Sequence, residues 1–249
     1  MTRHRAVGVG AAALLTMTAL AACGSLAQVQ PGVGAPTSSV RASASTSRAG
    51  GPSTAASVVP GAVLGELDRL RVAGRGPMTG YSRVRFGPPW EDTDRNGCDT
   101  RNDILRRDLA DVRLKPGSHG CVVLSGTLHD PYSGRSMAFE RGESTSELVQ
   151  IDHVVSLGNA WQSGAAGWSD AKRLAFANDP LDLRAVEGTL NQQKGDANAA
   201  SWLPPNKAFR CTYVARQVSV KTAYQLSVTA AEKAAMQRVL AACPEQAVP

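Results

Sequence analysis

Apolar residues recur with the period of a helix at two places in the first half of the chain. The first set, Val63, Leu64, Leu67 and Leu70, predicts an amphipathic helix near residues 61–73. The second helix starts at Thr100-x-x-Asp103, which resembles a capping box, and is ended by Lys115-Pro116-Gly117. Its apolar positions are Ile104, Leu105, Leu109 and Val112.

Strand patterns and turn residues alternate in the middle of the chain. Residues 121–129 are rich in Val, Leu and Thr and predict a strand, and residues 130–134 predict a turn. The returning strand is predicted at 137–140. The strongest strand pattern covers 148–155, and a shorter one covers 181–186. These patterns predict a small antiparallel sheet.

Helical patterns separate the later strands and fill the rest of the chain. Short helices are predicted at 158–163 and 169–178. Thr189-x-x-Gln192 opens a further helix that runs to about Trp202. The C-terminal part is helical, and Thr229-x-x-Glu232 caps its last helix. The predicted fold class is α+β, with a small antiparallel sheet and several additional helices.

The first 23 residues have the pattern of an export signal. A short basic stretch at residues 3–5 precedes an apolar run at 6–22, and small residues lead to Cys23. The end of this run resembles a bacterial lipoprotein cleavage site, which implies that Cys23 is lipid-modified and becomes the mature N-terminus. An ordinary cleaved signal peptide is the alternative. The apolar run is shorter than the ~20 residues that a membrane-spanning helix needs.

Composition divides the rest of the chain into a tether and a domain. Residues 24–58 contain no acidic and no aromatic residue, so they cannot bury enough apolar surface to offset the entropy of ordering. Residues 59–249 have the length of a single domain. Four of the 27 basic residues and none of the 21 acidic ones precede Glu66, which leaves a net charge of about +2 for the domain. This balance neither predicts nor excludes a nucleic-acid partner.

Four cysteines remain after Cys23, namely Cys98, Cys121, Cys211 and Cys243. An even number in an exported chain indicates two disulfides, for which three pairings are possible. The short loops favour Cys98–Cys121 and Cys211–Cys243. A four-cysteine zinc site is the competing idea, but no C-x-x-C pair is present.

Polar residues occur at fixed points of a strand, strand, helix sequence between residues 148 and 205. Asp152 and His153 lie near the end of the first strand, Asp182 lies in the second, and the helix opens with Asn191-x-x-Lys194-x-Asp196. This ordered set resembles the HNH (ββα-metal) nuclease superfamily. It is most similar to exported actinobacterial lipoproteins related to the C-terminal domain of the GmrSD restriction endonucleases, and the HNH domain of RNA-guided CRISPR nucleases has similar spacing. The resemblance extends over most of residues 80–205.

The resemblance implies a role for each of these residues. Asp152 would bind a divalent metal through its carboxylate, and Asn191 through its side-chain carbonyl. His153 would deprotonate the attacking water. Asp182 stands where the family usually has an Asn that orients the imidazole; an Asp also accepts a hydrogen bond from the ring and would raise the pKa of His153.

The chemistry of phosphodiester hydrolysis requires residues of these types. A hard divalent ion offsets the developing negative charge and prefers oxygen ligands, which favours Mg²⁺ first and Mn²⁺ second. Lys194 lies three residues beyond Asn191 on one helix face and would approach the phosphate. Arg184 and Arg101 are weaker candidates for binding the nucleic-acid backbone on either side of the scissile phosphate. Consecutive strand residues face opposite sides, so Asp152 and His153 share a site only if the strand ends or bulges there.

Three functions are compatible with these patterns. The first is an exported, monomeric endonuclease that acts on DNA, or on RNA, and touches the membrane only through its lipid. The second is a cell-wall hydrolase, although no H-E-x-x-H or H-x-x-E-H zinc motif is present. The third is a non-enzymatic lipoprotein that uses a nuclease-like scaffold for binding. Metal-dependent cleavage that requires His153 would separate the first function from the third.

Overall fold

The structure, a computed structural model, describes residues 61–143 and 145–249. The predicted signal segment 1–23, with Cys23, and the predicted tether 24–58 lie outside the described residues. Within the described ranges, no helix combines the length and the apolar character that are needed to cross a membrane.

Helices and short strands alternate along the described residues. The helices are α1 (Ala62–Arg69), α2 (Thr100–Asp108), α3 (Leu157–Ser163), α4 (Asp170–Ala177), α5 (Gly188–Lys194), α6 (Arg210–Tyr224) and α7 (Ala230–Leu240). The strands are β1 (Leu109–Leu114), β2 (Val123–His129), β3 (Ser136–Glu140), β4 (Val149–His153) and β5 (Leu183–Glu187). Single 3₁₀ turns occur at η1 (Arg83–Phe86), η2 (Ala165–Gly167) and η3 (Lys207–Phe209).

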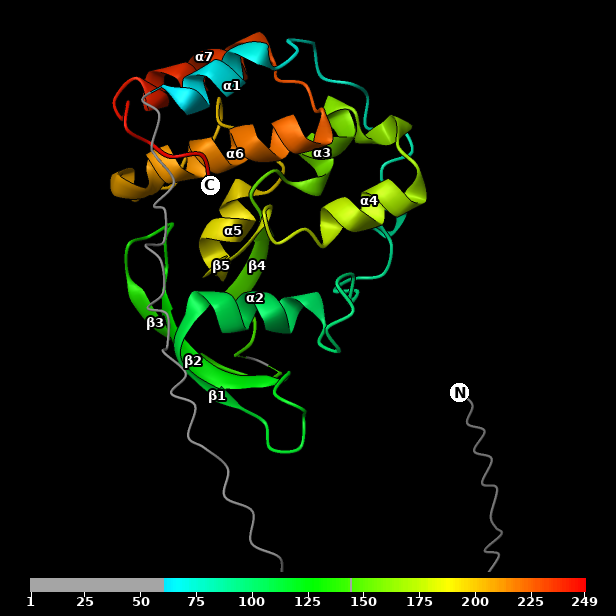
Figure 1. The fold of residues 1–249 in the computed structure, drawn as a ribbon, viewed down its shortest axis with the longest axis vertical. Coiled ribbons are helices and arrows are strands. Elements are labelled where there is room, and N and C mark those ends of the chain that lie inside the picture. The colour runs from blue at the N-terminus through cyan, green and yellow to red at the C-terminus, as the bar shows by residue number, and fades with distance from the viewer. Residues whose placement is uncertain (1–60, 144) are drawn as a thin grey trace, which may run out of the picture. The chain divides into compact units, whose positions relative to one another are not determined.

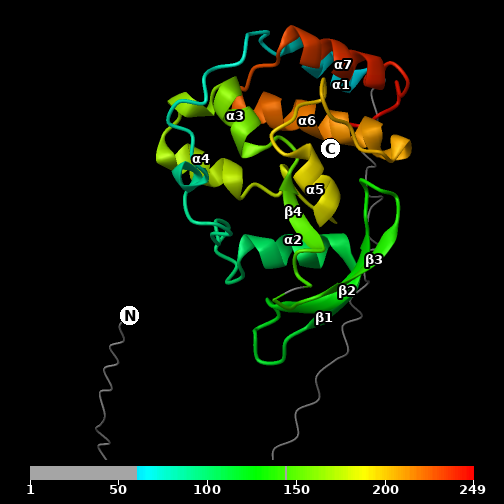
Figure 2. The same ribbon diagram turned by 180° about the vertical axis from the view of Figure 1, so that it is seen from behind.

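These elements are stacked along the long axis of the domain (Figures 1 and 2). Helices α1 and α7 lie side by side at one end, and α6 packs beneath them. The β1–β2–β3 sheet lies near the other end, next to α2. Strands β4 and β5 and helix α5 lie between these two layers, so both layers contribute to their surroundings.

Both sheets are antiparallel, and the smaller one, formed by β4 and β5, carries Asp152 and His153. Strand β4 pairs with β5 so that Asp152 lies opposite Arg184 and His153 lies opposite Leu183. Helix α5 follows β5 directly and packs on both strands. Helices α3 and α4 are inserted between the two strands. The α+β class is therefore confirmed, and the strand, strand, helix order is present.

Buried apolar side chains cover the β4–β5 pair from several directions. Val154 and Val186 belong to the cluster formed with α1, α6 and α7. Ile151 and Leu183 belong to a second cluster formed with α2 and the three-stranded sheet. Val155 joins a third, formed with α3 and α4. Close-packed surroundings of this kind hold a strand pair rigidly, which gives the polar residues at its end a fixed base.

The second predicted helix is shorter than expected. Its N-cap is Asp99, whose carboxylate accepts a hydrogen bond from the backbone of Asn102 at 2.8 Å, so Thr100 is the first helical residue. The helix ends at Asp108, and Leu109–Leu114 form β1 instead of its last turns. A short apolar run fits either period, and pairing with β2 decides in favour of the strand.

Helix α5 also ends early. It was predicted to continue to about Trp202, but its last residue is Lys194. Gly195 follows with φ 49° and ψ −130°, which lies outside the helical region and is accessible to glycine. Gly195 therefore stops the helix as its C-cap residue.

Two disulfides fasten the ends of the domain. Cys98 is joined to Cys121, and Cys211 is joined to Cys243, which is the local pairing that the short loops favoured. The first links the segment before α2 to the segment before β2, and the second links α6 to the end of α7. With all four sulfurs in disulfides, a four-cysteine zinc site is excluded.

Candidate functional site

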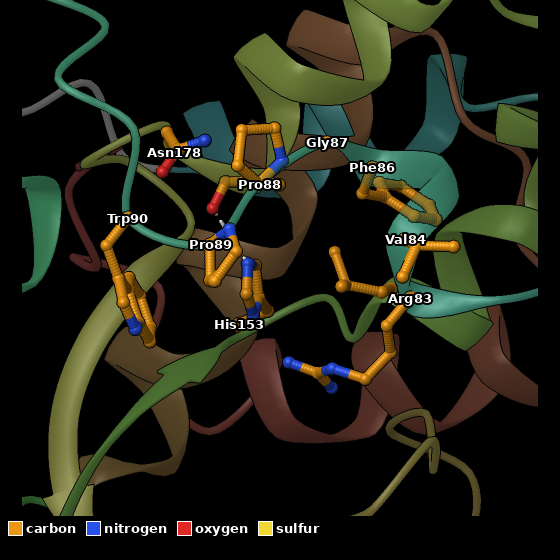
Figure 3. Close-up of a pocket in the computed structure, with 11 residues that line it drawn as sticks. Arg83, Val84, Phe86, Gly87, Pro88, Pro89, Trp90, His153 and Asn178 are labelled. Atoms are coloured by element: carbon orange, nitrogen blue, oxygen red, sulfur yellow. Dashed lines mark hydrogen bonds between the residues drawn. The ribbon is translucent and has the colours of Figure 1, made fainter. Parts of the chain in front are cut away.

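Two cavities meet at His153. The polar cavity, with a volume of about 410 Å³, is lined by Asp152, His153, Asn191 and Asp196 among others. The apolar cavity, with a volume of about 220 Å³, is lined mainly by the segment that contains Phe86, Gly87, Pro88, Pro89 and Trp90 (Figure 3). His153, Arg83 and Leu157 line both cavities. The end of β4 therefore forms the wall between them.

His153 is the last residue of β4 and is held by a backbone carbonyl. Its Nε2 lies 2.9 Å from the oxygen of Ala177. A carbonyl oxygen only accepts hydrogen bonds, so Nε2 carries the proton and Nδ1 keeps its lone pair. Burial of the ring, with a smaller contribution from Arg83, lowers the pKa of His153 to about 4. The imidazole is therefore neutral at neutral pH and has one nitrogen able to accept a proton.

Asp152 is buried, and both of its carboxylate oxygens are engaged. Oδ2 accepts a hydrogen bond from the Tyr132 hydroxyl at 2.5 Å, and Oδ1 accepts one from Lys194 Nζ at 2.9 Å. Burial raises the pKa of Asp152, and the charge of Lys194 opposes this rise. Because β4 ends at His153, both Asp152 and His153 line the polar cavity. A shared site for these two residues required β4 to end or bulge at this point, and β4 does end at His153.

Lys194 lies behind the site. Its side chain is fully buried, and its ammonium donates to Asp152 Oδ1 at 2.9 Å and to the backbone oxygen of His153 at 2.7 Å. It lines neither cavity. In place of the predicted approach to a phosphate, the structure shows Lys194 supporting two consecutive residues of β4.

Asp182 is buried next to the turn that follows β4. Its Oδ1 accepts from the backbone of Val155 at 2.7 Å, and its backbone oxygen accepts from that of Val154 at 2.8 Å. Burial raises the pKa of Asp182 well above its usual range. The predicted hydrogen bond to His153 is absent among the described residues, because the carboxylate faces this backbone. The carbonyl of Ala177 contacts the imidazole instead.

Asn191 reaches the polar cavity from α5. Its Nδ2 donates to Gln150 Oε1 at 2.9 Å, which fixes the orientation of the amide. The amide oxygen takes part in no hydrogen bond within the described ranges. Asn191, Asp152 and His153 therefore line one cavity from two elements, as the sequence predicted for a common site.

The three arginines of interest lie in different surroundings. Arg101 donates to the backbone oxygen of Val149 at 3.2 Å and so fastens α2 to the start of β4. The guanidinium of Arg184 lies over the ring of Phe209, 5.7 Å from its centre. Neither lines a cavity at His153. Arg83 in η1 is exposed and lines both.

Comparison with known proteins places this site in a family. Residues 99–239, more than half of the chain, match the family described as GmrSD restriction endonucleases, C-terminal domain. The chain belongs to this family. The family is one of nuclease-related domains. The matched residues include β4, β5 and α5, and therefore Asp152, His153 and Asn191 of the polar cavity.

A secreted fungal protein is a further relative. A protein of Arthroderma benhamiae described as an uncharacterized secreted protein is 43% identical over 179 residues, which are 71% of this chain and 82% of the relative. The two disulfides of this chain fit an extracellular location, in agreement with the description of the relative as secreted. No solved structure matches the chain.

The residues of the polar cavity fit a hydrated divalent cation. An ionised carboxylate has about four lone-pair sites, of which Tyr132 and Lys194 use two on Asp152. Asn191 adds a hard amide oxygen, and the cavity has room for the waters that Mg²⁺ retains. No group of three or more His, Cys, Asp or Glu side chains in the described ranges is arranged to hold a metal. A cation would therefore rely on two protein oxygens and water, against the opposing charge of Lys194.

Several supporting residues were missed by sequence reasoning. Gln150 lies two residues before Asp152 and therefore on the same face of the strand, a spacing that could have identified it. Ala177 acts through its backbone oxygen, which leaves no sequence signal. Arg83 lies in a turn-rich stretch without a periodic pattern. Tyr132 was assigned only to a turn, yet its hydroxyl contacts Asp152.

The loop before α2 has a spacing that sequence reasoning also missed. Asp92, Asp94, Asn96 and Gly97 match the first six positions of a calcium-binding loop, and Asp103 stands at the twelfth position, where that loop has Glu. The Asp92 carboxylate accepts from the backbone of Asn96 at 3.1 Å and of Gly97 at 2.9 Å. These bonds stabilise the loop itself, and we assign it no ligand.

Proposed function

We propose that this chain is a metal-dependent endonuclease that hydrolyses phosphodiester bonds of nucleic acid, with DNA as its first candidate substrate. One observation carries the proposal: Asp152, His153 and Asn191 line a single polar cavity at the end of a strand, strand, helix unit. Membership in a family of restriction endonuclease domains supports the same reaction class.

Each residue has a chemical task in this proposal. Asp152 and Asn191 hold a divalent ion, Mg²⁺ in first place and Mn²⁺ in second. When bound, this ion offsets the negative charge that develops on the phosphoryl oxygens. Nδ1 of His153 takes a proton from the attacking water, while Ala177 keeps the ring in the correct tautomer. Arg83, on the wall shared by the cavities, binds the phosphate.

Lys194 and Asp182 are positioning residues in this proposal. Lys194 fixes the carboxylate of Asp152 and the backbone of His153, and Asp182 fixes the two residues that follow. Arg101 and Arg184 were predicted to bind the nucleic-acid backbone beside the scissile phosphate. Both side chains have other partners in the structure, and this role stays a prediction.

The N-terminal pattern predicts export, and the disulfides fit an extracellular location. We propose that Cys23 anchors a monomer to the outer face of the cell membrane by its lipid, and that no other part of the chain contacts the bilayer. Metabolic labelling with a fatty acid, compared between the wild type and Cys23→Ser, tests this anchor. A secreted, unlabelled wild type would leave the ordinary cleaved signal peptide as the explanation.

The deciding experiment is cleavage of plasmid and single-stranded DNA by the purified protein. We expect cleavage with Mg²⁺ or Mn²⁺, none with EDTA, and a loss of about 10² to 10⁴ in rate for His153→Ala. His129→Ala is the matched control, because His129 is exposed, bonds Ser136 and lines neither cavity. It should cut at the wild-type rate.

Three results would contradict the proposal. Undiminished cleavage by His153→Ala would remove His153 as the base. No cleavage of DNA or RNA with any metal, by a folded protein with both disulfides intact, would instead indicate a binding lipoprotein on a nuclease-like scaffold. Release of fragments from cell-wall polymer would indicate a wall hydrolase.

A further inference from the structure

The apolar cavity borders the proposed phosphate position. It shares His153 and Arg83 with the polar cavity, and its lining also includes Pro88, Pro89 and Trp90. Figure 3 shows His153 between Trp90 and Arg83 in the same view. A phosphodiester held at the shared wall therefore has a polar space on one side and an apolar space on the other.

One buried polar atom in the apolar cavity lacks a partner. Asn178 lines this cavity and is 2% exposed. Its Nδ2 donates to the backbone oxygen of Leu174 at 3.0 Å, which assigns the nitrogen and leaves the oxygen facing elsewhere. Among the described residues, Oδ1 of Asn178 has no hydrogen-bond partner. A buried acceptor of this kind indicates a donor that is supplied by a ligand or by water.

The backbone of Trp90 gives a second indication. Trp90 has φ 61°, a conformation that favours glycine or asparagine and is an outlier for a bulky residue. The turn alone therefore does not select an indole at this position. Trp90 is partly buried against the core and also lines the cavity. Strained residues of this kind cluster at ligand sites.

We propose that the apolar cavity binds one nucleobase beside the scissile phosphate, stacked on Trp90 and donating an N–H to Asn178 Oδ1. This subsite rests on the proposed function, since Arg83 and His153 place the phosphate at its edge. At about 220 Å³ the cavity is smaller than those that bind drug-sized molecules, and it suits a single planar ring system. Recognition by stacking on an aromatic side chain is typical of single-stranded nucleic acid.

The test uses single-stranded DNA with one cleavable phosphodiester, all other linkages being methylphosphonates. The base next to the cleavable linkage is adenine, unsubstituted purine or absent, on the 5′ or the 3′ side. The proteins are the wild type, Trp90→Ala and Trp90→Phe, with Leu148→Ala as the control because Leu148 is 58% exposed and lines neither cavity. Melting curves for each variant show whether it is folded.

For the wild type, removal of the base on one side should raise KM about 5- to 150-fold, with kcat little changed. Trp90→Ala should raise KM on the normal strand and reduce the difference between strands with and without the base to the two- to tenfold contribution of Asn178, and Trp90→Phe should recover most of the lost difference. Unsubstituted purine, which has no N–H donor, should raise KM about two- to tenfold over adenine. An equal KM for the two purines would overturn the assignment to Asn178.

A binding measurement separates this subsite from the proposed function. Fluorescence anisotropy in EDTA compares the affinity of each protein for the normal and the abasic strand without cleavage. Base-dependent binding that is weakened in Trp90→Ala supports the subsite even if no metal permits cleavage. Absence of cleavage would then overturn the proposed function alone. Equal KM values and equal affinities for the normal and the abasic strand would overturn the subsite. So would a Trp90→Ala variant that loses the same affinity for both of these strands.

Discussion

Two lysine side chains are fully buried in this domain, and each faces a buried carboxylate. Lys221 Nζ lies 3.0 Å from Asn159 Oδ1, 3.1 Å from the backbone oxygen of Ser227 and 3.1 Å from Glu232 Oε1. Its ammonium thus makes two hydrogen bonds and one ion pair, all with packed helices and their connections. Lys194 Nζ has two protein acceptors, and these belong to Asp152 and His153 at the polar cavity.

The difference shows that the same buried charge pair serves the fold in one place and the site in the other. A buried ion pair contributes little net stability compared with apolar residues, but removal of one partner leaves an unpaired buried charge. For Lys221 this penalty falls on the contacts of α6 with α3, with α7 and with the segment before α7. For Lys194 it falls on the proposed metal ligand and on the strand end that carries the proposed base.

The largest expected effect is that of Lys194→Met. Asp152 would lose its counter-charge, so we expect a loss of about 3–5 kcal/mol in the free energy of unfolding. At a temperature where the variant is folded, cleavage should fall about 10- to 100-fold, as for other residues that orient a metal ligand. Denaturant titration and initial rates measure the two losses. A stable variant with full activity would contradict the positioning role.

Lys221→Met should separate stability from activity. Glu232 would be left buried and unpaired, and the expected loss of stability is again about 3–5 kcal/mol. The specific activity of the folded fraction should stay near the wild-type value, because Lys221 lines neither cavity. If this variant lost activity as strongly as Lys194→Met, the two pairs would not differ as proposed.

Removal of both partners gives a smaller effect and sharpens the contrast. Lys221→Met combined with Glu232→Leu replaces the pair by apolar groups, which should return the stability to within about 1 kcal/mol of the wild type. Lys194→Met combined with Asp152→Leu should recover stability in the same way and remain inactive. A double-mutant cycle compares the coupling energies of the two pairs. Recovery of cleavage in the second pair would exclude Asp152 as a ligand.

Local patterns in the sequence predicted the elements that depend on local contacts. The hairpin of β2 and β3, the strand β4 and the capping box before α7 agree with the predictions, because turn residues and caps act within a few positions. The boundary between α2 and β1 was wrong because Leu109 and Val112 fit either period, and only the pairing with β2 decides between them.

The site was predictable in part. The strand, strand, helix order and the family resemblance that it carries predicted that Asp152, His153 and Asn191 share a site, and the three residues line one cavity. The burial of Lys194 was not predictable, since a lysine at i+3 normally faces solvent and only the tertiary contact with Asp152 holds it inside. The orientation of Asp182 depends on the backbone after β4.

The smallest expected effect comes from the cap of the helix that carries Glu232. The Thr229 hydroxyl accepts from the backbone of Glu232 at 3.1 Å, and Glu232 Oε2 accepts from the backbone of Thr229 at 3.3 Å. Thr229→Ala should therefore lower stability by about 1 kcal/mol. Since the capping box also orients the carboxylate that faces Lys221, the loss should shrink when it is measured in the Lys221→Met, Glu232→Leu background. Cleavage should be unchanged in both backgrounds, and a loss of activity would mean that α7 is coupled to the site.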